Sequence, residues 1–138
     1  MSQIVLLAED DPTVRKFVTT SLERESFIVF PASSGVEALQ VCRNIVKVDI
    51  LLTDVRMGDG LNGIELAERI TKEKPETKVL VMSGFPETEA QASKKHLPFL
   101  RKPFTHADLV ERVREVLSNV PARSKRKNLQ EDNGDERT

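Results

Sequence analysis

The sequence predicts an α/β protein in which helices cover both faces of one parallel sheet. Three observations support this prediction. Short aliphatic runs recur along the chain, segments with a helical spacing of apolar residues follow them, and turn-forming residues separate the two. Aliphatic runs of about four to eight residues are typical of strands that are buried on both faces. Their alternation with amphipathic helices indicates right-handed crossovers between parallel strands.

The first strand and helix meet at a change from apolar to acidic residues. The aliphatic run of residues 3–8 is followed by three acidic residues. Pro12 suits the first turn of a helix, where its missing N–H leaves no bond unmade, and Asp11 is a suitable N-cap. Apolar residues then recur at helical spacing, which predicts the first helix over residues 12–25.

The second and third strand–helix units repeat this pattern. The predicted strands are residues 27–30 and 49–53, and the predicted helices are residues 36–44 and 64–72. The third strand is a buried-type run that stops abruptly on a carboxylate, Asp54, and a glycine-rich segment follows it over residues 58–63.

The last two units are less uniform. Their predicted strands are residues 78–83 and 97–101, and their predicted helices are residues 87–95 and 105–117. The helix over residues 87–95 is short and has few apolar residues. The final helix has a clear apolar stripe, and it begins with Thr105 as N-cap and Asp108 three residues later, which approximates a capping box.

Five strands in this alternation favour a flavodoxin-like, doubly wound sheet with the strand order 2-1-3-4-5. In such a fold, ligands bind outside the carboxyl ends of the strands, at the switch point between strands one and three. Glu9 and Asp10 follow the first strand, and Asp54 follows the third. We therefore expect these carboxylates to lie at one functional edge, although Asp54 taken alone also fits a solvated loop residue.

Composition limits the domain organisation. The chain has 138 residues, 38% of them hydrophobic and 31% charged, which is enough for one domain with a core. We predict that this domain spans residues 1–118. Basic and acidic residues dominate residues 119–138, which predicts a disordered tail. The basic run of residues 123–127 could contact a nucleic acid or another partner, but a solvated segment is the simpler interpretation.

Charge and hydropathy argue against several classes of function. The net charge of −1 and six scattered phenylalanines do not indicate direct nucleic-acid binding by the domain. No apolar run approaches the roughly 20 residues of a membrane span, and the N-terminus lacks a signal-peptide pattern. We therefore expect no membrane partner and a cytoplasmic location. Cys42 lies among apolar helical positions, which predicts a buried packing thiol.

Three carboxylates at two neighbouring strand ends would repel one another without a cation. Oxygen ligands of this kind suit a hard, partly hydrated ion, which points to Mg²⁺. Metals that prefer imidazole find no ligand set, because His96 and His106 both lie near helix ends, where we expect them to face solvent.

Two further strand ends supply complementary groups. Ser83 ends the fourth strand with a hydroxyl, and Lys102 follows the fifth strand with a positive charge. Each alone is a common surface feature. Together with a carboxylate and a metal ion they match the needs of phosphoryl transfer, which depends on positioning and charge neutralisation. Aspartate also serves as a nucleophile that forms acyl phosphates.

This set of residues resembles the receiver domain of the bacterial two-component response-regulator family over roughly residues 3–117. The resemblance is carried by Glu9-Asp10, Asp54, residues 57–63, residues 81–84 and residues 99–104. It implies that Asp54 is the phosphoacceptor for a histidine kinase, a histidine phosphotransfer protein or a small donor such as acetyl phosphate. It also implies that phosphorylation switches the surface of the last two strand–helix units for binding to a downstream protein that the sequence does not identify.

The same resemblance implies roles for the other residues. Mg²⁺ would be bound directly by Asp10, through water by Glu9, and also by Asp54 and the backbone carbonyl of Arg56. Asp11 is a rival for the acidic pair, but its position just after the pair assigns it as the helix cap.

Three residues of the last two units complete the implied switch. Lys102 would pair with one phosphoryl oxygen, and Ser83 would turn to bond another. Phe99 occupies the position of the aromatic switch residue, although an ordinary core role fits it as well.

The loop after Asp54 departs from the commonest family pattern. Gly58 stands where proline is frequent, and Gly63 lies one residue later than usual, so we expect a longer and more mobile loop. We also expect Arg56 to screen an acyl phosphate on Asp54 from water.

Two alternative functions remain open from the residues. A phosphatase that forms an aspartyl phosphate usually carries a second aspartate two residues after its nucleophile, but this chain has Arg56 there. A degenerate receiver that serves only for docking would not need the complete set of acidic, hydroxyl and lysine groups.

Overall fold

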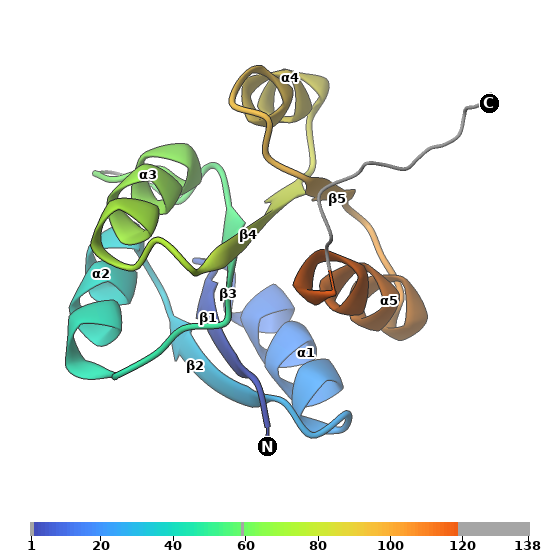
Figure 1. Ribbon diagram of the computed structural model, residues 1–138. Coiled ribbons are helices and arrows are strands. Elements are labelled where there is room, and N and C mark those ends of the chain that lie inside the picture. Colours follow the sequence, from blue (N-terminus) through green and yellow to red (C-terminus); the bar gives the residue numbers. More distant parts are fainter. Residues whose placement is uncertain (1, 59, 119–138) are drawn as a thin grey trace, which may run out of the picture.

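The computed structural model describes residues 2–58 and 60–118, and these form one five-stranded parallel sheet with helices on both sides (Figure 1). The elements follow in the order β1 (Ile4–Ala8), α1 (Pro12–Glu23), β2 (Ile28–Ala32), α2 (Gly35–Asn44), β3 (Ile50–Asp54), α3 (Gly63–Glu73), β4 (Lys78–Ser83), α4 (Pro86–Lys94), β5 (Phe99–Arg101) and α5 (His106–Leu117). The sheet order is β2-β1-β3-β4-β5, which confirms the predicted doubly wound topology. The predicted tail lies outside the described residues.

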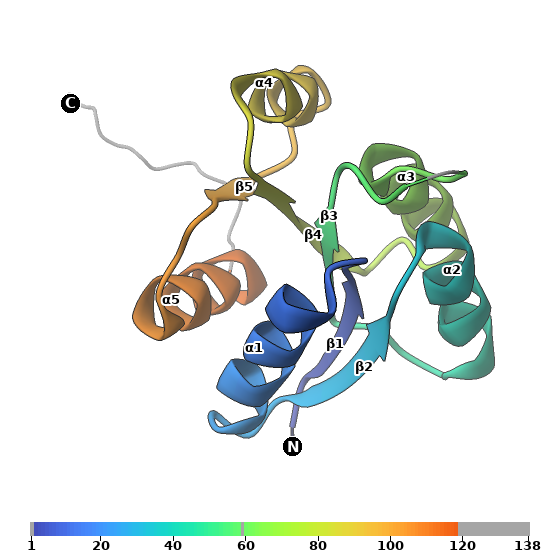
Figure 2. The same cartoon turned by 180° about the vertical axis from the view of Figure 1, so that it is seen from behind.

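The helices form two layers because successive side chains of each strand point to opposite faces of the sheet. Figure 2 shows α1 and α5 on one face and α2 and α3 on the other. In β3, Ile50 and Leu52 belong to the core beneath α1 and α5, whereas Leu51 belongs to the core beneath α2, α3 and α4. All three side chains are fully buried. The near-continuous apolar strands of the sequence therefore reflect burial on both faces.

The register of the sheet aligns the strand ends that carry polar groups. Ala8, the last residue of β1, pairs with Thr53, and Asp54 pairs with Met82 next to the end of β4. Ser83 at the end of β4 pairs with Arg101 at the end of β5. All the strands run in parallel, so the segments that follow them meet along a single edge.

Several predicted boundaries differ from the observed ones, and each difference has a local cause. β2 continues through Pro31 to Ala32, because an edge strand needs no donor on its outer side. The chain leaves α1 at Glu23 rather than two residues later, and Ser26 then adopts a φ of 71° as the backbone turns toward β2. β5 begins only at Phe99, two residues later than predicted.

Side-chain caps fix the starts of most helices. Asp11 accepts hydrogen bonds from the backbone N–H groups of α1, and Thr105 forms the predicted capping box with Asp108 in α5. Asn62 forms a second capping box at α3. α4 is the exception, because its N-cap residue is Phe85, whose side chain cannot accept a hydrogen bond.

Gly63 brings the start of α3 against the end of β3. Its N–H donates a 2.8 Å hydrogen bond to the Val55 carbonyl, and a Cβ atom placed on it would lie 1.9 Å from the Asp54 carbonyl oxygen. Only glycine permits this approach, because any side chain would collide with rigid backbone.

No helix among the described residues has the length and apolar character needed to cross a membrane.

We predict that Gly63→Ala lowers the free energy of unfolding by about 1–3 kcal/mol, the usual cost of forcing extra atoms into a packed site. Urea unfolding followed by circular dichroism would measure this loss. Gly84→Ala is the matched control, because a Cβ there meets only the Lys102 side chain at 3.9 Å. Equal stability of the two variants would contradict the close-approach argument.

Candidate functional site

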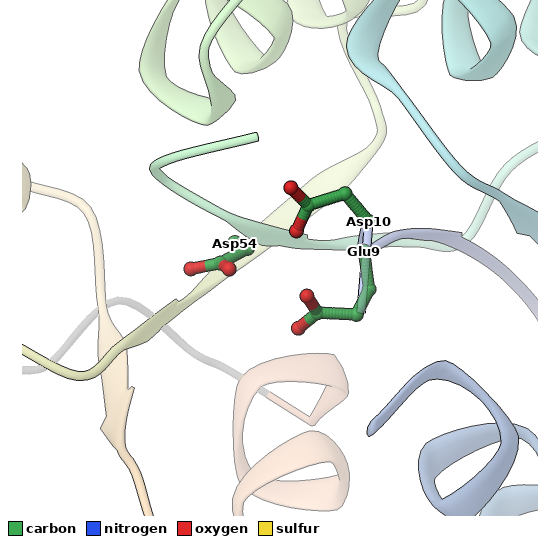
Figure 3. Close-up of side chains that lie close together, drawn as sticks. All are labelled: Glu9, Asp10 and Asp54. Atoms are coloured by element: carbon green, nitrogen blue, oxygen red, sulfur yellow. The ribbon is translucent and has the colours of Figure 1, made fainter. Parts of the chain in front are cut away.

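Three carboxylates converge at the carboxyl end of the sheet. Glu9 and Asp10 extend from the end of β1 toward Asp54 at the end of β3 (Figure 3). One oxygen from each carboxylate lies within 4.8 Å of the others. Glu9 is fully buried, Asp54 is partly buried and Asp10 is exposed, so the cluster opens to solvent on one side. The structure thus brings together the three acidic residues that the sequence placed at two separate strand ends.

Glu9 is a buried acidic side chain whose two oxygens are both engaged. Oε1 accepts a 2.9 Å bond from the Lys102 ammonium, and Oε2 accepts a 3.1 Å bond from the Asp11 N–H. Burial raises the pKa of Glu9, and the charge of Asp54 adds to this effect, while the hydrogen bond from Lys102 opposes it. The pKa of Glu9 is raised on balance, mainly because the side chain is buried.

Lys102 places a cation between two of the acidic groups. Its Nζ lies 2.9 Å from Glu9 Oε1 and 3.2 Å from Asp54 Oδ2. Burial tends to lower the pKa of Lys102, but the hydrogen bond to Glu9 and the charge of Asp54 outweigh it and raise the pKa. The backbone N–H of Lys102 also donates to the Ser83 carbonyl at 2.7 Å, so β5 delivers this lysine from a fixed position beside β4.

The orientation of Asp54 is set by its own backbone surroundings. Oδ1 accepts a 2.9 Å hydrogen bond from the Val55 N–H, which leaves Oδ2 directed to Lys102. The Thr53 hydroxyl donates to the Asp54 carbonyl at 2.8 Å, and the Gly63 backbone packs against the same carbonyl. The carboxylate therefore projects from a rigid strand end toward solvent.

Ser83 is fully buried and faces the first turn of α4. Its hydroxyl donates to the Phe85 carbonyl at 2.9 Å and also forms a short hydrogen bond with the Thr88 hydroxyl. Thr88 is itself 2.9 Å from the Phe85 carbonyl. The sequence predicted a role for Ser83 but not its partner Thr88, whose only signal is a hydroxyl in the first turn of a helix without a side-chain cap.

Arg56 connects the loop after β3 to the start of α4. Its guanidinium carbon lies 4.5 Å from the centre of the Phe85 ring, and Nη2 lies 4.0 Å from a Glu87 oxygen. Both Arg56 and Phe85 are exposed. The pair links the loop after Asp54 to Phe85, whose carbonyl accepts the Ser83 hydroxyl.

Phe99 is partly buried and packs against the core beneath α2, α3 and α4. Its backbone carbonyl lies 3.4 Å from Arg112 Nε of α5. This placement is compatible with either of the roles that the sequence left open, a core residue or a switch residue.

Other predictions about individual residues have mixed outcomes. Asp11 is the N-cap of α1 and Cys42 is buried, as predicted. His96 is exposed, as expected. The expectation for His106 is wrong: its ring is partly buried, with Nε2 3.0 Å from Glu25 in the turn after α1 and Nδ1 buried without a hydrogen-bond partner among the described residues. This burial comes from the packing of α5 on α1, which the sequence pattern does not reveal.

The donor set fits a hard divalent cation. All the side-chain ligands are carboxylate oxygens, which Mg²⁺ and Ca²⁺ prefer, and a partly solvated cluster leaves room for bound water. If all are ionised, the three carboxylates against the single Lys102 ammonium leave two negative charges, which one divalent ion would balance. Electrostatics and ligand chemistry therefore agree on the kind of ion that this edge would hold.

Comparison with known proteins gives a consistent result. Residues 5–114 match the model of the response regulator receiver domain family. The chain is 34% identical over 119 residues to the response regulator receiver protein CpdR of Brucella abortus, covering 82% of this chain and 95% of that protein. It is 35% identical over 123 residues to the sensor kinase CckA of the same organism, covering 84% of this chain but only 13% of CckA.

Solved structures agree with the sequence matches. A response regulator receiver protein from Sinorhizobium medicae superposes with a TM-score of 0.76 at 26% identity, covering 84% of this chain and 94% of that one. The fold, the strand order and the family model thus point to one signalling module. The chain belongs to the response regulator receiver domain family of two-component systems.

Proposed function

We propose that Asp54 is the phosphoacceptor of this receiver domain, and that its phosphorylation depends on Mg²⁺. The observation that carries this proposal is the position of Asp54 Oδ2, 3.2 Å from the Lys102 ammonium and within the acidic cluster. Because the Val55 N–H already bonds Oδ1, Oδ2 is the oxygen that would attack phosphorus. The phosphoryl group then passes from the donor to Asp54, and the donor's leaving group departs on the opposite side.

Mg²⁺ would be held by Asp10, Asp54 and the backbone carbonyl of Arg56, with Glu9 acting through water. When bound, the ion would neutralise the carboxylates and the equatorial oxygens of the phosphoryl group. Lys102 would then exchange its bond to Asp54 for a phosphoryl oxygen. The excess of carboxylates over the Lys102 ammonium supports this arrangement, because a divalent cation would balance it.

Ser83 and Phe99 would convert phosphorylation into a change of surface. To bond a phosphoryl oxygen, Ser83 must leave the Phe85 carbonyl, and the Thr88 hydroxyl, 2.9 Å from that carbonyl, can then donate to it instead. Contacts of Ser83 and Lys102 with a phosphoryl oxygen would exist in only one arrangement of the last two strand–helix units. Only contacts that differ between two arrangements can shift the population from one to the other. The surface that would change lies on β4–α4 and β5–α5, where the downstream protein would bind.

The phosphodonor would be a histidine kinase or a histidine phosphotransfer protein. A groove of about 390 Å³ that includes Lys102 of the site gives such a protein a mostly apolar surface. It is lined by Thr13, Val14, Phe17, Lys102, Pro103 and Phe104. Direct binding of nucleic acid by the domain forms no part of the proposal.

A phosphatase is the second candidate, but one observation disfavours it. The residue two positions after Asp54 is Arg56, whose side chain packs on Phe85 and carries no group that could act as general acid or base. A docking-only domain is a third candidate, and the complete charged cluster around Lys102 argues against it.

We expect wild-type protein incubated with acetyl phosphate and Mg²⁺ to gain the mass of one phosphoryl group, and Asp54→Asn to gain none. Intact-protein mass spectrometry would measure this. Incubation with a histidine kinase or phosphotransfer protein gives a second donor class. Failure of the wild type with both donor classes would overturn the proposal, and rapid turnover of unrelated phosphomonoesters would favour the phosphatase.

We predict that Glu9→Gln raises the free energy of unfolding at neutral pH in the absence of Mg²⁺. The native pKa of Glu9 lies above its ordinary value of 4.5, so the folded protein holds this proton more tightly than the unfolded chain does. The contribution of Glu9 to wild-type stability is therefore fully present below the unfolded pKa, and it declines as pH rises through the native pKa.

The gain from Glu9→Gln should consequently be small in acid and grow toward neutral pH in urea unfolding experiments. Glu37→Gln is a control that should change the free energy of unfolding in the opposite direction. Hydrogen bonds from the Ser33 N–H and hydroxyl lower the pKa of Glu37. That variant should lose stability at neutral pH. A Glu9→Gln protein that is less stable than the wild type at neutral pH would refute this electrostatic description.

We also predict that Arg56→Ala accelerates loss of the phosphoryl group from Asp54. An exposed cation–π contact contributes about 0.5–1 kcal/mol, so losing it corresponds to a rate increase of about two- to fivefold if the contact keeps the turn closed over the phosphoryl group. Decay of the phosphorylated mass after removal of the donor would measure the rate. Mg²⁺ affinity should stay unchanged, because alanine keeps the backbone carbonyl. An unaltered decay rate would remove the screening role of Arg56.

A further inference from the structure

We propose that Arg15 is a positioning residue for the metal site, holding the backbone of Glu9 and Asp10 so that both carboxylates face the cation. The inference rests on the proposed Mg²⁺ binding and adds a residue that does not itself touch the ion. It depends on contacts between the side chain of Arg15 and two backbone carbonyls, which are independent of the contacts made by Lys102.

Glu9 and Asp10 lie in a short connection between β1 and α1, outside both elements. The N–H of Glu9 extends the sheet by donating to the Ala32 carbonyl at 3.0 Å. The side chain of Asp11 is used as the helix cap. The bond from the Asp11 N–H to Glu9 Oε2 restrains the peptide between Asp10 and Asp11, but none of these interactions holds the two carbonyl groups directly.

Arg15 supplies this restraint from the second turn of α1. Its Nη1 donates to the Glu9 carbonyl at 2.9 Å and approaches the Asp10 carbonyl at 3.4 Å. Its own backbone N–H donates to the Asp11 carbonyl at 2.8 Å, which anchors the residue in the helix. Hydrogen bonds from a charged donor are stronger than those from neutral donors, so a single guanidinium can restrain both peptide units.

The charge of Arg15 has the opposite effect on metal binding. A positive charge near the acidic cluster repels Mg²⁺, so a purely electrostatic role predicts tighter binding when the charge is removed. A positioning role predicts weaker binding, because the ligands lose their fixed geometry. Arg15 is half-buried and bonded to the backbone of the ligand residues, so its charge is little screened, and weaker binding by Arg15→Met would mean that positioning outweighs this repulsion.

The test is an isothermal titration of wild type, Arg15→Met and Arg15→Lys with MgCl₂, without any phosphodonor. We expect Arg15→Met to bind Mg²⁺ about tenfold more weakly, the lower end of the usual loss when an outer partner of a metal ligand is removed. Arg15→Lys keeps the charge but has a shorter side chain than arginine, so its ammonium should reach the two carbonyls less well and Mg²⁺ should also bind more weakly than to the wild type.

Lys16→Met is the matched control, because Lys16 is exposed on the same helix and its loss removes one positive charge. It should bind Mg²⁺ as tightly as the wild type or more tightly. In an Asp10→Asn background, Arg15→Met should have a smaller effect than in the wild type, because one of the ligands that Arg15 positions is already impaired.

A structural readout separates loss of positioning from loss of folding. The Asp11 N–H is bonded to Glu9 Oε2, so its amide hydrogen should exchange faster in Arg15→Met while the exchange of core amides stays unchanged. If the wild type binds Mg²⁺ and Arg15→Met binds it equally tightly, this inference is overturned and the proposed function stays intact. Absence of Mg²⁺ binding by the wild type would instead overturn the proposed metal site itself.

Discussion

The contact of one ammonium group with two carboxylates organises the functional edge of this domain. Lys102 joins residues 93 and 48 positions earlier in the chain, so it ties the end of β5 to the ends of β1 and β3. Buried ion pairs of this kind add little net stability, because desolvation offsets much of their attraction. The ion pairs of Lys102 mainly fix the geometry of the site, because the same charged lysine holds both carboxylates in place.

α4 is the element that is least firmly attached to the rest of the fold. It has nine residues, its N-cap side chain forms no hydrogen bond, and only Thr88 and Ala92 are buried along it. Much of its attachment comes from polar contacts near its first turn, namely the hydroxyl pair with Ser83 and the bidentate ion pair of Glu89 with Arg101. Elements held by few buried apolar contacts open at low free-energy cost. A small rearrangement at Ser83 can therefore be transmitted to this helix.

Sequence reasoning predicted the topology and the meeting of Glu9, Asp10 and Asp54, because parallel strands place their carboxyl ends together whatever the details of packing. It stopped β2 too early at Pro31, because the effect of proline depends on whether the strand lies at an edge. It missed Thr88 and Arg15, since a hydroxyl or guanidinium bonded to a backbone carbonyl leaves no periodic signal. The burial of His106 was unpredictable for a related reason: it depends on how α5 sits against α1, not on the local pattern of either helix.

The contact of Gly63 with the backbone at the end of β3 closes the base of the loop between β3 and α3. Asp54 and Val55 contact Gly63 at the start of α3. The loop between them therefore begins and ends at nearly the same point in space. A closed loop of this kind can gain or lose residues with little entropic penalty, because the cost of closure grows only slowly with length. The closure at Gly63 therefore separates the position of Asp54 from the length of the loop that follows it.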